Sequence, residues 1–229
     1  VYAGMQEEQR KLYDAGVYQL RESLNAEGDT PSKLQILAQL MRLRQVCCDP
    51  GLIYENYGGG SAKLEACMQL VGEAVGGGHK VLIFSQFTSM LEILAEQLQK
   101  QGITYYMLTG SVQKEKRAEM VRDFHVDDTQ IFLISLKAGG TGLNLTAADI
   151  VIHYDPWWNL AAQNQATDRA YRIGQKHKVT VFRLIAKNTI EERILEMQES
   201  KQQLSKQIIS EEQFSMEYLS PKMLEEILQ

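Results

Sequence analysis

Two arginines and a run of glycines give this sequence its most informative chemistry. Arg169 and Arg172 stand three residues apart in the segment 160–171, whose pattern predicts a helix, so we expect both guanidinium groups on one helical face. A glycine-rich turn at 139–142 follows the apolar run 131–134 and lets the backbone approach a ligand closely. A guanidinium pairs two oxygens at once and does not lose its charge near neutral pH. Together these features predict a polyphosphate site.

On residue type and spacing alone, structural roles explain the same residues. An exposed arginine is usually a solvated surface charge, and a salt bridge with Asp155 or Asp168 is a second simple role. The glycines are equally explained by a tight turn that needs positive φ. The residue types therefore allow phosphate chemistry without requiring it.

The same stretch resembles motifs V and VI of the Swi/Snf-type helicase-like ATPases. The sequences that carry the resemblance are GGTGLNL at 139–145, DPWWN at 155–159 and QATDRAYRIGQ at 165–175. With KVLIFSQF at 80–87, which resembles motif IV, the likeness covers roughly residues 80–210. In that family these motifs lie on the second of two RecA-like lobes, so the resemblance implies one lobe of a two-lobed motor.

The resemblance assigns a nucleotide side to this lobe. Arg169 and Arg172 match the arginines of motif VI, which in the family act as arginine fingers on the γ-phosphate of ATP. It also implies that ATP and Mg²⁺ are bound mainly by an N-terminal lobe that this sequence does not contain. The further residues that it places near the nucleotide are Gly140, Gly142, Asn144, Gln165 and Asp168.

A second set of residues is expected, from the same resemblance, to contact double-stranded DNA. Hydroxyl and amide groups bind phosphates without reading the base sequence, which suits a motor that moves along any DNA. A tryptophan is more often a packing anchor, but Trp158 matches a family position that lies beside the DNA. The expected DNA contacts are Ser85, Gln86, Thr109, Ser111, Ser135, Lys137, Thr141 and Trp158.

The hydrophobic pattern predicts the elements that position these residues. From residue 62 onward, short apolar strands alternate with helices of ~10–15 residues, which predicts an α/β fold with a mostly parallel sheet between helical layers. The resemblance makes this a RecA-like three-layer domain. Loops at the carboxyl ends of such strands collect at one edge of the sheet. The predicted strands are 80–84, 103–108, 131–134, 150–154 and 179–185.

Helical segments flank the predicted sheet on both sides of the sequence. Two helices precede residue 50, the second with Thr30 as N-cap and Pro31 in its first turn. A long helix to about residue 209 starts with Thr189 as N-cap. The resemblance makes this helix a brace toward the other lobe, although a surface helix covering the sheet explains it as well. The predicted division is an arm at 1–56, a RecA-like lobe at 57–187 and a brace helix with its tail at 188–229.

Bulk composition narrows the protein class. With 229 residues, 44% hydrophobic and 23% charged, the chain is typical of a soluble globular protein, and no apolar run approaches the ~18 residues that span a membrane. Cys47 and Cys48 are adjacent and the histidines are isolated, so we expect no metal site and an intracellular location, whether cytoplasm, nucleoid or nucleus. The net charge of −5 is lower than dedicated nucleic-acid-binding domains usually carry.

A phosphate-binding loop of the G-x-x-x-x-G-K-[ST] type is absent from the sequence. Lys63 follows three glycines, but Leu64 stands where Ser or Thr is required and no strand precedes the loop. We therefore expect the second motor lobe of an ATP-dependent DNA translocase, similar to chromatin remodellers and inactive as an ATPase by itself. One alternative is a non-catalytic α/β module that binds DNA or protein. Another is an unrelated nucleotide enzyme, which would need G-x-G-x-x-G after a strand.

Overall fold

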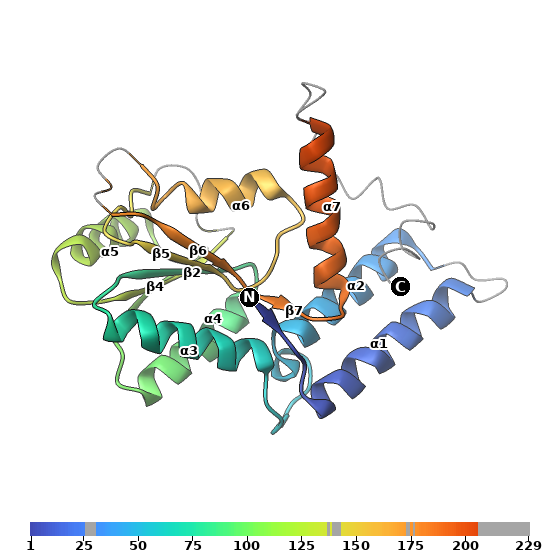
Figure 1. Cartoon of the computed structure of the whole chain (residues 1–229). Helices are drawn as coiled ribbons and strands as arrows, with labels where there is room; N and C mark the ends of the chain where they lie inside the picture. Colours follow the sequence, from blue (N-terminus) through green and yellow to red (C-terminus); the bar gives the residue numbers. More distant parts are fainter. Residues whose placement is uncertain (26–30, 137, 139–142, 173–174, 176, 206–229) are drawn as a thin grey trace. The chain divides into compact units, whose positions relative to one another are not determined.

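The chain folds into two compact units, seen here in a computed structural model (Figure 1). One unit comprises residues 64–184 together with Val1, and the other joins residues 2–63 to the chain from residue 185 onward. The structure describes residues 1–25, 31–136, 138, 143–172, 175 and 177–205.

The unit of residues 64–184 is built on a parallel sheet whose strands alternate with helices along the chain (Figure 1). The strands are β2 (Val81–Ser85), β3 (Tyr105–Leu108), β4 (Ile131–Ser135), β5 (Ile150–His153) and β6 (Thr180–Arg183), and the helices are α3 (Ala62–Gly76), α4 (Thr88–Lys100), α5 (Lys114–Val126) and α6 (Leu160–Thr167). The strand order is β3-β4-β2-β5-β6, and each of these pairings is parallel. The predicted α/β class is confirmed.

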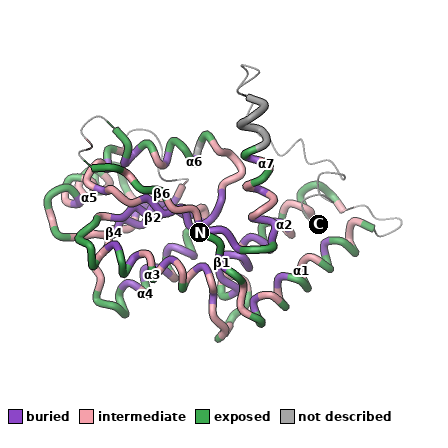
Figure 2. The backbone as a smooth tube through the Cα atoms, viewed as in Figure 1, coloured by how far each residue is buried: buried purple, intermediate pink, exposed green. Residues whose placement is uncertain are grey.

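Continuous apolar sequence explains why β2 and β4 form the centre of the sheet. Both strands, VLIFS and IFLIS, are buried at all five positions (Figure 2). Strands of a parallel sheet are covered on both faces, so they read as unbroken apolar runs rather than as alternating patterns. Ser85 pairs in register with Ser135, so one serine ends each of these neighbouring strands.

Helices cover both faces of this sheet. On one face a single core joins Phe84 and Phe132 of the sheet to Phe124 of α5 and Ala166 of α6. The rings of Phe124 and Phe132 meet edge to face, with centroids 5.2 Å apart. Burying such a side chain contributes about 1.5–3 kcal/mol. Helices α3 and α4 lie on the other face, which completes the three layers (Figure 1).

The second unit is mainly helical and contains a small parallel ribbon. Its elements are β1 (Tyr2–Ala3), α1 (Glu7–Asn25), α2 (Lys33–Cys48), the 3₁₀ turn η1 (Pro50–Leu52), β7 (Ile185–Ala186) and α7 (Ile190–Ser205). The strand predicted over 179–185 is confirmed as β6 for Thr180–Arg183, but its continuation to residue 185 is wrong: Ile185 begins the separate strand β7, which pairs with β1. The partner strand lies near residue 2. Because the two strands are so far apart in the sequence, the local hydrophobic pattern does not indicate that they pair.

Capping side chains determine where two of these helices begin. Helix α2 starts at Ser32, which accepts a hydrogen bond from Gln35 N (3.3 Å) while Gln35 Oε1 accepts one from Ser32 N (2.7 Å). The prediction of Thr30 as N-cap is therefore wrong, and Thr30 itself lies outside the described residues. Thr189 is confirmed as the N-cap of α7, because its Oγ1 accepts a hydrogen bond from Glu191 N (3.2 Å).

A buried ion pair links distant parts of the helical unit. Lys63 Nζ lies 2.8 and 2.9 Å from the two carboxylate oxygens of Glu191, and both side chains are almost fully inaccessible. Glu191 also accepts a hydrogen bond from Ala186 N at 2.8 Å. The lysine that follows the glycines at 58–60 is therefore held by a buried carboxylate, in keeping with the absence of a phosphate-binding loop there.

Candidate functional site

Four loops leave the carboxyl ends of neighbouring strands and gather at one edge of the sheet. They follow β2, β3, β4 and β5, and because the pairings are parallel these ends point the same way. Hydrogen bonds continue the pairing into the loops, from Leu136 N to Ser85 O (3.0 Å) and from Tyr154 N to Phe84 O (2.9 Å). The predicted convergence of the loops is thus present in the structure.

A fully buried carboxylate, that of Asp155, organises the loop after β2. Its Oδ1 accepts a hydrogen bond from Ser85 Oγ at 2.6 Å, and its Oδ2 accepts one from Gln86 Nε2 at 2.6 Å. Gln86 N also points to this carboxylate, 3.3 Å from Oδ1. Ser85 Oγ in turn accepts a hydrogen bond from Phe87 N at 3.1 Å. These donors offset the cost of burying the carboxylate and fix the conformation of residues 85–87.

Two of the predicted DNA contacts lie in the interior instead. Ser85 is 0% and Ser135 2% exposed, because each ends a central strand that is covered on both faces. The hydroxyl of Ser85 is already bonded to Asp155. The side chains of both serines are therefore covered in this structure, and their contact with DNA stays a prediction.

Other predicted DNA contacts are reachable from solvent. Ser111 is exposed, and Gln86, Thr109 and Trp158 are half-buried. Thr109 Oγ1 and Ser111 Oγ lie 2.8 Å apart, so the loop after β3 presents two hydroxyl groups together. The structure therefore leaves polar groups of two loops accessible at the edge. Two further predicted contacts, Lys137 and Thr141, lie outside the described residues.

The two candidate arginines do not share a helical face, which corrects the sequence prediction. Helix α6 ends at Thr167, and beyond it Arg169 N bonds to Ala166 O, three residues back rather than four. Arg169 is 4% exposed, whereas Arg172 is exposed. Burial, and then the charge of Arg172, lowers the pKa of Arg169. The site holds one buried and one exposed cation.

Of the residues predicted on the nucleotide side, Gln165 and Asp168 lie next to this arginine pair in sequence, and Asn144 lies in the loop after β4. Asn144, Gln165 and Asp168 are all exposed. A hydrogen bond from Leu145 N to Arg169 O, 3.0 Å long, brings the loop that contains Asn144 beside the arginines. Exposed amide and carboxylate groups next to two cations are suited to a polar, charged ligand. The predicted contacts Gly140 and Gly142 lie outside the described residues.

Sequence reasoning missed two glutamines that hold the loops of this edge. Gln163 is 1% exposed, and its Oε1 accepts a hydrogen bond from Trp157 N at 3.1 Å. Gln175 Nε2 donates to Ala148 O at 2.8 Å and to Ala170 O at 3.1 Å, joining the loop after β4 to the segment after α6. A polar residue in a polar segment gives no sequence signal of burial, so only the tertiary structure identifies these positioning roles.

His153, at the end of β5, is neutral in the folded state. Its ring stacks on Phe84 with centroids 5.5 Å apart, and its Nε2 lies 2.9 Å from Thr167 Oγ1. Burial, with a smaller effect from the charge of Arg183, lowers its pKa from 6.5 to about 3. The ring therefore joins the sheet to α6 as an uncharged packing group.

Within the residues that the structure describes, no group of three or more His, Cys, Asp or Glu side chains is arranged to hold a metal ion. None of the described helices is both long enough and apolar enough to cross a membrane.

Comparison with known proteins identifies the family. Residues 62–174 match the helicase conserved C-terminal domain. The chain is 42% identical over 226 residues to the putative ATP-dependent helicase/translocase YwqA of Bacillus subtilis, a match that covers 96% of this chain and 24% of that protein. The SWI2/SNF2 ATPase C-terminal domain of Sulfolobus solfataricus superposes with a TM-score of 0.74 at 32% identity, covering 92% of this chain and 88% of that one.

The SWI2/SNF2 ATPase core of Sulfolobus solfataricus has also been solved in complex with double-stranded DNA, and it matches with a TM-score of 0.76 at 33% identity over 91% of this chain and 45% of that one. The chain belongs to the Swi2/Snf2-type family of helicase-like ATPases and forms its C-terminal RecA-like lobe. It spans about a quarter of the length of YwqA and a fifth of the related Mycoplasma pneumoniae helicase.

Proposed function

We propose that this chain is the second motor lobe of an ATP-dependent translocase on double-stranded DNA. The observation that carries the proposal is the pair Arg169 and Arg172, one buried and one exposed, beside the loop edge of a parallel sheet. A solvent-facing guanidinium whose partner is embedded in the lobe is well suited to reach a phosphate presented by another lobe. A guanidinium is the side-chain group suited to bind phosphate oxygens in pairs.

In this proposal Arg172 is the arginine finger that contacts the γ-phosphate of ATP, and Arg169 supports it from the lobe interior. The planar guanidinium of Arg172 can bind two phosphate oxygens at once, which a lysine cannot do. Stabilisation of phosphoryl-transfer charge by such a finger is worth about 10³–10⁵ in rate. The nucleotide-side residues that accompany the arginines are Gly140, Gly142, Asn144, Gln165 and Asp168.

ATP and Mg²⁺ are proposed to bind mainly on an N-terminal RecA-like lobe of the same protein. This chain contains no G-x-x-x-x-G-K-[ST] loop, and Lys63, which most resembles such a lysine, is paired with Glu191. The contribution of this lobe is thus cationic and positional, not a cradle for the nucleotide. Closure of the two lobes on ATP would bring Arg172 to the phosphate.

The DNA track is proposed to run along the same edge. Gln86, Thr109 and Ser111 offer accessible polar groups there, and the complex of the Sulfolobus core with double-stranded DNA supports this class of ligand. Contacts to phosphates carry no sequence information, as translocation requires. Lys137, Thr141 and Trp158 are proposed to complete the track, while Ser85 and Ser135 support it from beneath.

The proposal divides the chain by role into an arm at 1–56, the motor lobe at 57–187 and a brace at 188–229. The protein is proposed to act inside the cell, where DNA and ATP are present. Similarity to the ISWI chromatin-remodeling complex ATPase ISW1 of Saccharomyces cerevisiae, 37% identical over 218 residues, supports a remodelling-type activity as an extension of the proposal.

Substitution of Arg172 in the full-length protein tests the proposed function. Arg172→Ala and Arg172→Lys are each expected to lower DNA-stimulated ATP turnover by about a thousandfold or more, since both remove the fork. Binding of a double-stranded DNA probe in the presence of a non-hydrolysable ATP analogue is expected to stay within about threefold. Arg122→Ala, which removes an exposed arginine of α5, is the matched control and should leave both quantities unchanged. Near-wild-type turnover by Arg172→Lys would remove Arg172 from the catalytic role.

A further inference from the structure

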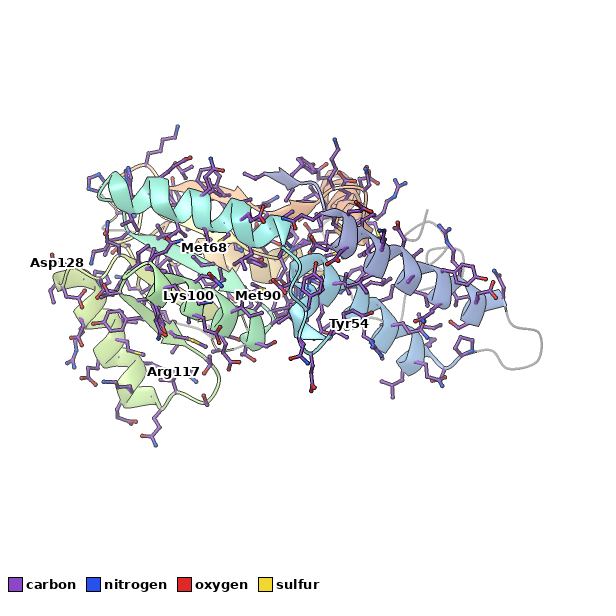
Figure 3. The ribbon with its side chains drawn as sticks, turned by 90° about the horizontal axis from the view of Figure 1, so that it is seen from below. Tyr54, Met68, Met90, Lys100, Arg117 and Asp128 are labelled. Atoms are coloured by element: carbon purple, nitrogen blue, oxygen red, sulfur yellow. The ribbon has the colours of Figure 1, made fainter. Side chains whose placement is uncertain are left out.

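One side chain bridges two of the loops at the site edge. Arg117, in the first turn of α5, donates from Nε to Val112 O (2.7 Å) and from Nη2 to Gly110 O (3.1 Å). It also donates from Nη1 to Ala138 O at 3.2 Å. Figure 3 labels Arg117 on α5. The first two carbonyls belong to the loop after β3, and the third belongs to the loop after β4. A single guanidinium thus donates hydrogen bonds to carbonyl groups of the loops that follow two adjacent strands.

A local helix-capping role does not explain this arrangement. Gly110 and Val112 lie within seven residues of Arg117, so bonds to their carbonyls would serve to anchor the start of α5. Ala138 lies 21 residues away in the loop after β4, and a helix start has no need of it. Loop carbonyls outside regular secondary structure need donors, and a guanidinium offers five N–H groups in a rigid plane.

The loops that Arg117 joins are those that present the candidate DNA contacts. Thr109 and Ser111 flank Gly110, and their hydroxyls lie 2.8 Å apart. In sequence, Ala138 stands between Lys137 and the glycine-rich residues 139–142, to which the proposed function assigns phosphate contacts. We infer that Arg117 is a positioning residue that locks the loop after β3 to Ala138 in the loop after β4, so that the hydroxyl groups of Thr109 and Ser111 are held in place to meet phosphates of the DNA. This inference rests on the proposed function.

Two substitutions separate the contribution of the positive charge of Arg117 from that of its planar guanidinium. Arg117→Lys keeps the positive charge but has one ammonium, which cannot reach three carbonyls in a fixed plane. Arg117→Ala removes both. Lys116→Ala, at the exposed neighbouring position that pairs with Glu119, is the matched control. If only the charge of Arg117 mattered, the lysine variant would behave as wild type.

Two measurements on the full-length protein report separately on the stability of the loops and on the interaction with DNA. The first is hydrogen exchange of two peptides, one containing Val112 and one containing Ala138. In the structure, Val112 N donates to Thr109 O and Ala138 N donates to Ser135 O. The second is the double-stranded DNA concentration that half-saturates ATP turnover. For Arg117→Lys we expect exchange in both peptides to rise by about tenfold or more and the half-saturating concentration to rise by a similar factor, with a smaller change in maximal turnover. Lys116→Ala should match wild type in both.

Each contrary result has a defined meaning. Faster exchange in the Val112 peptide alone would identify a local helix cap and overturn the inference. Faster exchange in both peptides with unchanged DNA dependence would overturn the positioning role toward DNA. Absence of DNA stimulation in the wild-type protein would instead count against the proposed function, while the exchange experiment still decides whether Arg117 joins the loops. If Arg117→Ala does not fold, the lysine variant carries both measurements.

Discussion

Ser85 Oγ donates a 2.6 Å hydrogen bond to Oδ1 of Asp155, and this bond joins the end of β2 to the loop after β5 in the interior of the sheet edge. The other carboxylate oxygen accepts a bond from Gln86 Nε2, so both oxygens of Asp155 face donors. A carboxylate in this position acts on the surface indirectly. It determines how the half-buried Gln86 and the polar groups around it are presented.

Replacement of this carboxylate by an amide is expected to destabilise the lobe. In Asp155→Asn one oxygen becomes an NH₂ group that faces a donor, which leaves buried groups unsatisfied at a cost of about 1–3 kcal/mol. Ser85→Ala should cost less, because Gln86 still donates to the carboxylate. Urea unfolding of the isolated chain measures both changes, and a double mutant gives their coupling. Asp128→Asn, at an exposed aspartate, is the control, and a midpoint for Asp155→Asn equal to that control would contradict the prediction.

Alanine substitution of the two arginines of the site is expected to change the free energy of unfolding by different amounts. Arg169 is 4% exposed, so Arg169→Ala removes packed side-chain volume and should lower the free energy of unfolding by about 1–3 kcal/mol. Arg172 is exposed, and Arg172→Ala should change it by no more than about 0.5 kcal/mol. Equal unfolding midpoints for the two variants would show that Arg169 is not part of the folded interior.

The isolated chain is expected to show negligible Mg²⁺-dependent ATP hydrolysis, with or without double-stranded DNA. Its sequence contains no G-x-x-x-x-G-K-[ST] loop, so the nucleotide has no cradle on this lobe. Phosphate release from the purified chain, measured beside the full-length protein, checks this. Robust DNA-stimulated hydrolysis by the isolated chain would refute the assignment of the nucleotide cradle to another lobe.

The layered fold was predictable because its causes are local. The runs VLIFS and IFLIS are apolar at nearly every position, which is what a strand buried on both faces requires. Once the strands were parallel, the edge where their loops collect followed from geometry alone. The position of the candidate site could therefore be predicted before any side chain was placed.

The side-chain arrangement was not predictable because its causes lie far away in the sequence. Helix α6 ends at Thr167 although the following residues have a helical pattern: Thr167 Oγ1 contacts His153, and Arg169 O accepts a bond from Leu145 N. Beyond α6 the chain leaves regular helix, with Arg169 buried and Arg172 exposed. In the same way, nothing adjacent to Ser85 in the sequence indicates that its hydroxyl is taken by a residue 70 positions later.

His153 is expected to make the stability of the lobe depend on pH. Its pKa is about 3 when folded and 6.5 in an ordinary setting, so between these values the unfolded chain binds the extra proton. Stability therefore falls as pH falls below 6.5, by up to about 1.4 kcal/mol per pH unit from this group. His153→Gln should be less stable at pH 7 but lose less stability between pH 6 and pH 4. Urea unfolding at several pH values measures this slope. His177→Gln, at an exposed histidine, should keep the wild-type slope, and an unchanged slope in His153→Gln would contradict the prediction.

The buried pair Lys63–Glu191 is expected to be the most sensitive single interaction of the helical unit. The partners lie 128 residues apart in sequence and are 1% and 0% exposed as side chains. Removal of one partner leaves the other charged and buried, which typically costs about 3–5 kcal/mol. Lys63→Met and Glu191→Gln test this in the isolated chain by urea unfolding.

A control for that experiment is the exposed pair of Lys116 and Glu119, whose disruption by Lys116→Met should cost no more than about 1 kcal/mol. The double variant Lys63→Met with Glu191→Leu removes both charges, so it should recover part of the stability lost in Lys63→Met, because no uncompensated charge remains buried. Glu191 also accepts the bond from Ala186 N, so recovery is expected to be incomplete. If Lys63→Met lowers the free energy of unfolding as little as Lys116→Met does, the buried pair of Lys63 and Glu191 does not stabilise the helical unit.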